Sequence, residues 1–505
     1  MMTLIDNKLN KITMYRLVLY YVAGLLVIAF GLGFFGLVPN NPMTLAFTTA
    51  FITFVCWATN QLFARVLRVP VNTESIWITA FILALIMPSV SFDDTLGLEG
   101  LALASFVAIA SKFVLAIGRK HIFNPVAIGV VASAMLIDQP ATWWVGGNLE
   151  MLPFVLIGGL LVVRKVQRFD MIASFIFANL ATTLLTTDAE TYSGALQETV
   201  LYTPLFFAAF AMLTEPSTAP ADKVWRMVYG AIIGVLACAN IAYGDYYFTP
   251  ELAFLVGNVF AYVVSPKGRF KLTLLRVEKM ANGCFDFVFK PDRPLTFKAG
   301  QYVDWTLGVR NADDRGNRRP FTIASAPSET EVRLGVKFYS EPSAFKRSLA
   351  VLKPGASIYA SHVAGSFVLP KSRDEKMVFI AGGIGITPFR SMVQELINKG
   401  DPRELVLLYG NNRADEIAYA EVFDRAEREI GMKTVYAVND PHGAETNMHR
   451  GFIDAALITR QVPDFKERTF YISGPRVMVV KFQSVLKELG VAHSKIKVDF
   501  FPGFA

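Results

Sequence analysis

A run of four residues in the second half of the chain, Arg319-Pro320-Phe321-Thr322, has the side chains that a flavin needs. A guanidinium can neutralise a pyrophosphate, and an aromatic ring offers a flat face to an isoalloxazine. A threonine hydroxyl can form a hydrogen bond near the flavin N5 atom. Because such a run also occurs in ordinary strands, its interpretation depends on the sequence around it.

A second run can hold phosphate through its backbone. Residues 377–381 form a predicted buried strand, and Gly382-Gly383-Ile384-Gly385-Ile386-Thr387-Pro388 leads from it into a predicted helix over 389–398. Backbone N–H groups and the helix dipole make such a junction an anion site. Farther upstream, Gly365-Ser366 predicts a turn that admits a phosphate close to backbone amides. The two phosphate sites and the flavin-type run indicate redox chemistry in this half.

The elements that must position these residues can be read from the same half. Alternating apolar residues over 272–297 predict the short strands of an antiparallel β-barrel. Further strands at 405–410 and 469–475 complete an alternating α/β layout, and the second of them ends at Ser473-Gly474-Pro475.

The order and spacing of these elements over residues 270–505 resemble the ferredoxin–NADP reductase superfamily. The resemblance implies that FAD is held by Arg319, Phe321 and Thr322 and that its pyrophosphate meets Gly365 and Ser366. It implies that the nicotinamide dinucleotide contacts Gly382, Gly383, Gly385, Thr387, Gly474 and Pro475. Ser473 stands where the family commonly has Cys, so Thr322 and Ser473 are the candidate catalytic residues. Phe504 is the candidate for the terminal aromatic ring that covers the flavin.

The choice between NADH and NADPH stays open in the sequence. Arg413 follows the second strand of the nucleotide domain and favours a 2′-phosphate, whereas Asp415 and Glu416 favour NADH.

The first half has the composition of a membrane protein. Charged residues are sparse up to Ser265, and 53% of the 505 residues are hydrophobic. Ten apolar segments lie at 15–38, 43–62, 75–92, 100–117, 122–137, 149–163, 171–187, 199–213, 224–240 and 250–264. We therefore expect a polytopic α-helical membrane domain of ten spans.

The loops between these segments alternate in charge. One side carries Lys8, Lys11, Arg16, Arg65, Arg68, Arg119, Lys120, Arg164, Lys165, Arg168, Lys223, Arg226 and Lys267. The other side carries acidic residues and neither Lys nor Arg. The positive-inside rule then places both termini in the cytoplasm. Because the basic residues lie in short loops, the net charge of +7 does not indicate nucleic acid as a partner.

Proline positions recur with a period of half the first domain. Pro125 and Pro250 lie 125 positions apart, and Pro88 and Pro216 lie 128 positions apart. A unit of five spans repeated once must be inverted in the membrane, so we expect a 5+5 inverted repeat with helices broken at these prolines. The alternative is that each proline begins a helix at its first turn.

Three groups of residues in the first half form a recognisable pattern: His121, Asn124 and Pro125, then Ser193 and Gly194, and finally Glu215. Together they resemble the flavin-carrying membrane proteins of Na+-translocating NADH:quinone reductase and of the Rnf complex. The resemblance covers about residues 15–268 and implies FMN or riboflavin in the membrane domain. The family attaches FMN to the Thr of a Ser-Gly-Ala-Thr motif, and here Leu196 occupies that position. Leucine has no hydroxyl, so we expect a non-covalent flavin.

The numbers of histidine and cysteine residues exclude haem and iron–sulfur clusters as electron carriers. The first 265 residues contain one histidine, His121, which cannot supply the two bis-histidine haems of a transmembrane haem reductase. Three scattered cysteines cannot build an iron–sulfur site, and no metal site is predicted. Lys112, near the cytoplasmic end of the fourth segment, is either a snorkelling residue or a flavin contact.

The sequence thus predicts three domains, over residues 1–268, 269–371 and 372–505. They would form a multi-pass protein of a bacterial cytoplasmic membrane that passes electrons from cytosolic NADH or NADPH through FAD and a membrane flavin. The acceptor would be an extracytoplasmic flavoprotein or a quinone. The alternatives are a redox-driven Na+ or H+ pump and a scaffold protein within a larger complex. No oligomeric state is predicted.

Overall fold

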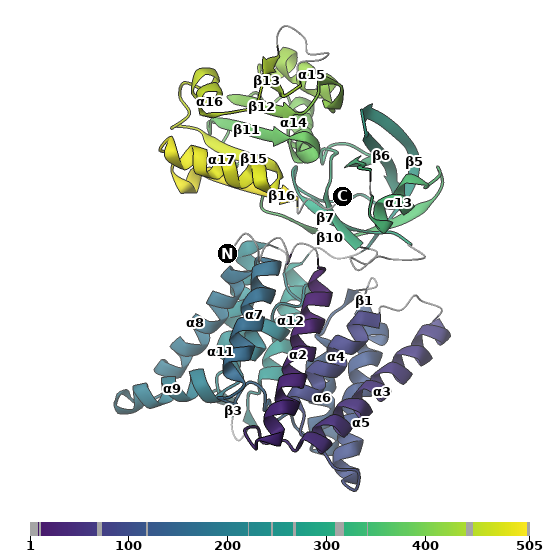
Figure 1. Cartoon of the computed structure of the whole chain (residues 1–505), viewed down its shortest axis with the longest axis vertical. Helices are drawn as coiled ribbons and strands as arrows, with labels where there is room; N and C mark the ends of the chain where they lie inside the picture. Colours follow the sequence, from purple (N-terminus) through teal and green to yellow (C-terminus); the bar gives the residue numbers. More distant parts are fainter. Residues whose placement is uncertain are drawn as a thin grey trace. The chain divides into compact units, whose positions relative to one another are not determined.

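A computed structural model describes residues 9, 12–67, 73–117, 120–220, 222–243, 246–265, 269–308, 318–340, 342–440 and 448–501. The chain divides into two compact units, Met1–Gly268 and Arg269–Ala505. Figure 1 colours the first unit from purple to teal and the second from teal-green to yellow. Phe504 lies outside the described residues.

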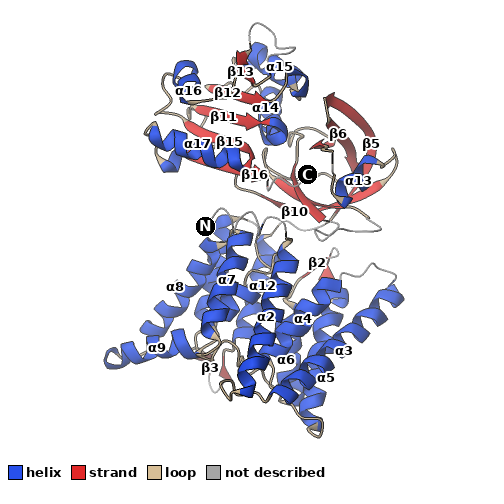
Figure 2. Ribbon diagram, viewed as in Figure 1, coloured by secondary structure: helices blue, strands red, loops and turns tan. Residues whose placement is uncertain are grey.

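The amino-terminal unit is built of helices, drawn in blue in Figure 2. A first group comprises α2 (Met14–Phe34), α3 (Pro42–Leu67), α4 (Thr73–Ile86), α5 (Thr95–Val114) and α6 (Pro125–Ile137). A second group comprises α7 (Leu152–Val166), α8 (Phe169–Leu185), the 3-10 turn η1 (Ala189–Thr191), α9 (Tyr192–Tyr202), α10 (Leu205–Phe207), the π-helix η2 (Ala208–Met212), α11 (Lys223–Leu236) and α12 (Pro250–Val264).

The two groups share a local motif at matching places. A hairpin of β1 (Ala116–Ile117) and β2 (Lys120–His121) precedes α6, and a hairpin of β3 (Ala242–Tyr243) and β4 (Tyr246–Tyr247) precedes α12. Figure 1 shows β1 and β3 at opposite ends of the helical unit, as an inverted repeat requires. Pro125 and Pro250 each lie in the first turn of a helix. The expectation that helices break at these two prolines is therefore wrong, because a proline at that position loses no hydrogen bond.

The helix before Pro88 does end early, and a distant loop satisfies its last carbonyls. α4 stops at Ile86, whose carbonyl accepts hydrogen bonds from the N–H groups of Thr142 (2.8 Å) and Trp143 (2.9 Å). The indole of Trp144 donates to the carbonyl of Ala84 at 3.2 Å. Backbone groups without a helical partner are therefore paired inside the protein, as the interior of a membrane demands.

The described helices differ from the predicted spans in length. Three of them, α2, α3 and α5, are long and apolar enough to cross a membrane, and the pair 189–202 and 205–212, bent by 54°, would add a fourth. Shorter apolar helices are Glu74–Ile86, Pro125–Ile137, Phe169–Leu185 and Pro250–Val264. Since a span needs about 20 residues, length and composition alone identify three or four candidate spans among the described residues.

The carboxy-terminal unit begins with an antiparallel sheet. Its strands are β5 (Phe270–Ala281), β6 (Cys284–Pro291), β7 (Tyr302–Thr306), β8 (Arg318–Thr322), β9 (Val332–Lys337) and β10 (Ser357–Ala364), in the order β8-β7-β10-β5-β6-β9. The N–H of Ala324 donates to the carbonyl of Arg333 at 2.9 Å. The two edges of the sheet thereby approach each other, and Phe287, Phe289 and Trp305 fill the interior. The helix α13 (Ala344–Ala350) packs against it through Phe345.

A parallel sheet follows, with helices on both faces. Its strands are β11 (Met377–Gly382), β12 (Leu405–Asn411), β13 (Lys433–Val438), β14 (His449–Arg450), β15 (Thr469–Pro475) and β16 (Ile496–Phe501), in the order β14-β13-β12-β11-β15-β16. One face is covered by α14 (Thr387–Lys399) and α15 (Ala420–Ile430), the other by α16 (Ala455–Gln461) and α17 (Arg476–Glu488). The strand order runs outward from β11 to β14 on one side and from β15 to β16 on the other, so the topological switch point lies between β11 and β15. Open α/β sheets bind ligands at such a switch point.

Candidate functional site

The flavin-type run lies on β8 and is fixed by its neighbour β7. Thr322 pairs with Tyr302 in the strand register, and its side chain is buried. The indole of Trp305 donates to the carbonyl of Phe321 at 3.1 Å, and the Phe321 ring lies 5.7 Å from that of Phe345. Arg319 donates to the neighbouring carbonyl of Arg318 at 2.8 Å. The strand thus presents a guanidinium, an aromatic ring and a hydroxyl from one short segment.

The turn after β10 lies beside this strand. Gly365 has φ +114°, and a Cβ at that position would lie 3.2 Å from Cδ1 of Tyr302. The side-chain amide of Gln301 donates to the Gly365 carbonyl at 3.1 Å. Ser366 follows with an exposed side chain. The structure therefore brings the Gly365 turn to the end of β8 through Tyr302, and only a residue without a Cβ fits the turn comfortably.

The glycine turn lies at the switch point of the parallel sheet. Gly382 ends β11, and Gly383–Ile386 form a 3-10 turn, η3, that leads into α14 at Thr387. A Cβ on Gly385 would lie 2.5 Å from the carbonyl oxygen of Ser473 and 2.6 Å from Cα of Gly474. The turn η3 therefore lies so close to the end of β15 that it admits no side chain at Gly385, which leaves backbone amides and a helix N-terminus to meet phosphate.

Ser473 lies inside this junction with an unused hydroxyl. Its side chain is fully buried, and its Oγ has no hydrogen-bond partner among the described residues. Leaving a buried hydroxyl unpaired costs about 1–3 kcal/mol, so such an atom marks a place where a bound group is expected. The cradle of glycines and this hydroxyl fit a nicotinamide dinucleotide, with Pro475 at the end of β15 beside it.

Asp499 is a candidate that sequence reasoning missed. It pairs with Ser473 in the register of β15 and β16. Burial raises the pKa of its carboxyl to about 6. In the sequence, Asp499 stands out only as an acidic residue before Phe500 and Phe501. The register of β15 and β16 is what places Asp499 beside Ser473.

The candidate residues of the amino-terminal unit fall into two places. At one end, His121 Nε2 lies 3.1 Å from Glu215 Oε1, although the two residues are 94 positions apart. The side-chain oxygen of Asn124 accepts hydrogen bonds from the first backbone N–H groups of α6, which begins at Pro125. The backbone N–H of Asn124 donates to Asn258 Oδ1 at 2.7 Å. Asn258 is a buried residue of α12 that sequence reasoning missed, because its partner lies 134 positions away.

Lys112 is held by hydroxyl groups. Its Nζ donates to Ser75 Oγ at 2.9 Å, to Thr79 Oγ1 at 2.8 Å and to the Ser75 carbonyl at 3.0 Å. The ammonium is thereby tied to α4 while Lys112 stays partly exposed, so both interpretations of this residue stay open.

Ser193 and Gly194 lie at the other end, on α9. Both are exposed, and a Cβ on Gly194 would meet nothing within 4 Å. Figure 1 shows α9 at the end of the helical unit opposite β1. The two groups of candidate residues therefore do not form one site. Among the described residues, no cluster of His, Cys, Asp and Glu side chains has the makings of a metal site.

Two family models match the chain. Residues 144–267 match the NQR2, RnfD, RnfE family, and residues 379–484 match the oxidoreductase NAD-binding domain. Each match covers about a quarter of the chain or less.

Similar proteins cover between about two fifths and three fifths of the chain. A flavohemoprotein of Bacillus subtilis is 24% identical over 59% of this chain and 72% of its own length. The reductase component DmpP of phenol 2-monooxygenase, from Pseudomonas sp. strain CF600, is 31% identical over 38% of this chain. This chain spans 53% of the length of that relative. Among solved structures, the FAD/NAD-binding domain of a Vibrio cholerae nitric oxide dioxygenase aligns over 46% of this chain and 98% of its own, with 19% identity and a TM-score of 0.41.

These matches identify two different regions in the chain. The chain joins a region that matches the NQR2, RnfD, RnfE family to a region that matches an oxidoreductase NAD-binding domain.

Proposed function

We propose that this protein carries electrons from cytosolic NADH or NADPH into and across a bacterial cytoplasmic membrane. The observation that supports the proposal is the joining of the two matched regions in one chain, an oxidoreductase NAD-binding domain and an NQR2/RnfD-type region. An extracytoplasmic flavoprotein or a quinone would take the electrons.

The residues of the carboxy-terminal unit would divide the work of hydride transfer. FAD, when bound, can take up a hydride and pass electrons on singly. Arg319, Phe321 and Thr322 would hold it, and the amides at the start of α14 would hold the dinucleotide phosphates. Ser473 would orient the nicotinamide through its hydroxyl, which has no hydrogen-bond partner among the described residues, and Asp499, whose pKa burial raises to about 6, would hold a proton beside it at mildly acidic pH.

The amino-terminal unit would hold a second flavin, FMN or riboflavin, without a covalent bond. His121 and Glu215 form a hydrogen-bonded pair at one end of this unit, and Lys112 lies on the neighbouring helix α5. Leu196 cannot form the phosphoester that the resemblance implies. We propose ten membrane segments in a 5+5 arrangement and both termini in the cytoplasm. Some of these segments, such as those that contain α4 and α6, would hold a helix that extends through only part of the bilayer.

An ion pump is the second candidate, and one observation weighs against it. A sodium site at the broken helix before Pro88 would need free carbonyl oxygens. The carbonyls of Ala84, Leu85 and Ile86 instead accept hydrogen bonds from residues 142–145. We therefore favour electron transfer without ion translocation.

The proposal is tested with the full chain in proteoliposomes that contain trapped ferricyanide. NADH does not cross the bilayer, so it reaches only molecules whose reductase unit faces outward. Reduction of the trapped acceptor is the expected result. NADH oxidation without reduction inside would favour a scaffold role, and uptake of radioactive sodium coupled to the reaction would show a pump.

A further inference from the structure

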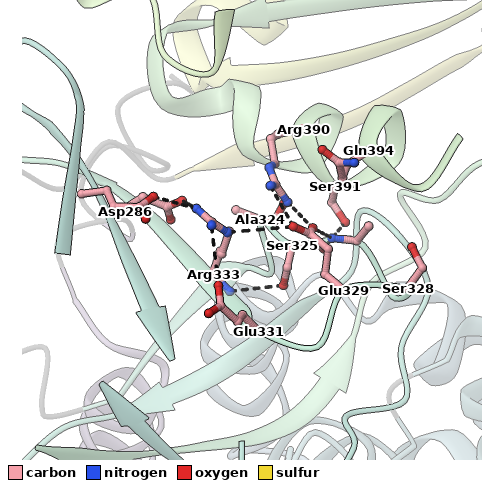
Figure 3. Close-up of polar contacts among 12 residues, drawn as sticks. Asp286, Ala324, Ser325, Ser328, Glu329, Glu331, Arg333, Arg390, Ser391 and Gln394 are labelled. Atoms are coloured by element: carbon pink, nitrogen blue, oxygen red, sulfur yellow. Dashed lines mark hydrogen bonds and ion pairs between the residues drawn. The ribbon is translucent and has the colours of Figure 1, made fainter. Parts of the chain in front are cut away.

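The helix α14 has two faces of different chemistry. One face carries Phe389, Met392 and Leu396 into the core, where Phe389 stacks on Phe379 with ring centres 4.5 Å apart. The opposite face carries Arg390, Ser391, Gln394 and Glu395, and none of these residues is more than 6% exposed. Burying polar groups costs free energy unless they find hydrogen-bond partners. Figure 3 shows those partners in the segment that follows the flavin-type run.

Arg390 makes the strongest of these contacts. Its guanidinium binds both carboxylate oxygens of Glu329, with Nη2 at 2.9 Å from Oε1 and Nη1 against Oε2. Nη1 also donates to the carbonyl of Ala324 at 3.1 Å. A bidentate pair between arginine and a carboxylate fixes orientation as well as distance. The ring of Tyr419 lies over the same guanidinium, with its centre at 5.7 Å.

Neighbouring residues of α14 hold the same segment. Ser391 Oγ donates to the carbonyl of Ser325 at 2.7 Å. Glu395 accepts from the N–H of Ser328 at 3.0 Å and from its hydroxyl at 2.6 Å. The segment 324–329 is thus held along its length by one helix.

The segment is also fixed to the antiparallel sheet. Arg333 on β9 donates its N–H to Ser325 Oγ at 3.2 Å, and its guanidinium binds the buried Asp286 at 2.8 Å. Glu329 lies 3.9 Å from Arg333 Nε, so its carboxylate bridges Arg333 and Arg390. A continuous set of polar contacts therefore runs from the interior of the sheet to α14, as Figure 3 shows.

These contacts connect two places that the proposed function requires to be in register. Ala324 follows Thr322 by two positions, and α14 begins at Thr387, where the glycine turn ends. We infer that Arg390 and Ser391 are positioning residues for hydride transfer, which hold the flavin-binding strand at a set distance from the nucleotide-binding turn. The inference rests on the proposed function and assigns these two residues no contact with either cofactor.

The expected consequence follows from the sensitivity of hydride transfer to distance. A displacement of 1 Å can lower a rate by about 100-fold while binding is retained. The limiting rate of flavin reduction should therefore fall by roughly 10- to 100-fold in Arg390→Gln and by a smaller factor in Ser391→Ala. FAD content and the apparent dissociation constant of the nucleotide should stay within about threefold of wild type. Arg390→Lys keeps the charge and one hydrogen bond, so it should recover part of the rate.

The test is stopped-flow reduction of the full chain in detergent, followed by the loss of flavin absorbance over a range of NADH and NADPH concentrations. A matched control is Arg468→Gln. Arg468 is also a buried arginine, and it binds Asp464 at 2.7 Å and the carbonyl of Glu404 at 3.2 Å, but at the amino-terminal edge of the parallel sheet. That variant should lower the melting temperature and leave the limiting rate unchanged.

The outcomes separate the inference from the proposed function. If the wild-type chain neither retains FAD nor loses flavin absorbance with NADH or NADPH, the proposed function fails and the inference fails with it. If the wild-type chain reacts and both variants match its limiting rate, the inference alone is wrong. It is wrong as well if Arg390→Gln and Ser391→Ala lose FAD in equal measure with their loss of rate, because the two residues would then serve FAD retention.

Discussion

Ser473 lies on β15 between two neighbouring strands, in register with Ala381 on β11 and with Asp499 on β16. With the dinucleotide bound, this unpaired hydroxyl should gain a partner. We expect Ser473→Ala to lower the rate of flavin reduction by about tenfold, which is the loss of one hydrogen bond of roughly 1.4 kcal/mol. Ser473→Cys should keep most of the rate, since a thiol is a weak donor of similar size. If Ser473→Ala and wild type reduce the flavin at equal rates, the Ser473 hydroxyl does not contribute to the site.

Asp499 should make the stability of the carboxy-terminal unit depend on pH. Burial raises its pKa from 3.8 to about 6, so the folded protein favours the protonated carboxyl. This contribution is complete below pH 3.8 and is lost as the pH rises through about 6, at a cost on the order of 2–3 kcal/mol. Asp499→Asn should therefore melt at a higher temperature than wild type at pH 7 and at a similar temperature at pH 4. Release of flavin fluorescence on heating measures both, and the exposed Asp374→Asn is the control.

Arg413 bears on the choice of nucleotide. It follows the end of β12, the strand whose carboxyl end commonly contacts the adenosine ribose. Its guanidinium is paired with Asp415 at 3.1 and 3.2 Å, so the local charge disfavours a 2′-phosphate. We expect kcat/KM for NADH to exceed that for NADPH, and Asp415→Asn to narrow the ratio. The ratio is measured from initial rates with both nucleotides. An unchanged ratio would mean that the 2′-position is recognised elsewhere.

At the scale of elements, the glycine turn between β11 and α14 should be intolerant of a single methyl group. A Cβ at Gly385 would lie 2.5 Å from the Ser473 carbonyl, whereas a Cβ at Gly410, near the end of β12, would lie 3.4 Å from its nearest neighbour. Gly385→Ala should therefore raise KM for the nucleotide by at least about tenfold or abolish turnover. Gly410→Ala should change KM little. Steady-state kinetics with FAD content measured in parallel tests the pair, and retained FAD in Gly385→Ala would localise the damage to the nucleotide site.

Local sequence predicts some of these elements and not others. The strand and helix around Gly382 were predictable, because a buried apolar run, a glycine turn and a helix follow within a few residues; the helix begins at Thr387 instead of Phe389. Pro125 and Pro250 were misinterpreted as breaks, because a proline inside an apolar run does not reveal where the helix starts. The pairs formed by Asn124 with Asn258 and by Ser473 with Asp499 depend on packing between distant segments. Neither pair leaves a local pattern.

In the whole molecule, a substitution in the site of one unit should leave the activity of the other unit unchanged. His121→Gln and Glu215→Gln remove one partner each from a pair 3.1 Å apart in the amino-terminal unit, while the carboxy-terminal unit keeps all of its contacts. Both variants should therefore oxidise NADH at the wild-type rate when a soluble acceptor is added on the same side of a proteoliposome. Reduction of an acceptor trapped inside should fall by at least about tenfold, because the remaining member of the hydrogen-bonded pair is left without its partner.

Flavin analysis of the same full-length samples completes this prediction. Acid denaturation should release all flavin from the wild-type chain, since Leu196 has no hydroxyl to form a phosphoester. The two variants should then lose the flavin of the amino-terminal unit and keep FAD. Flavin that stays with the denatured chain would contradict non-covalent binding. If both variants lose NADH oxidation and reduction of the trapped acceptor to the same extent, the two units do not carry out separate steps of electron transfer.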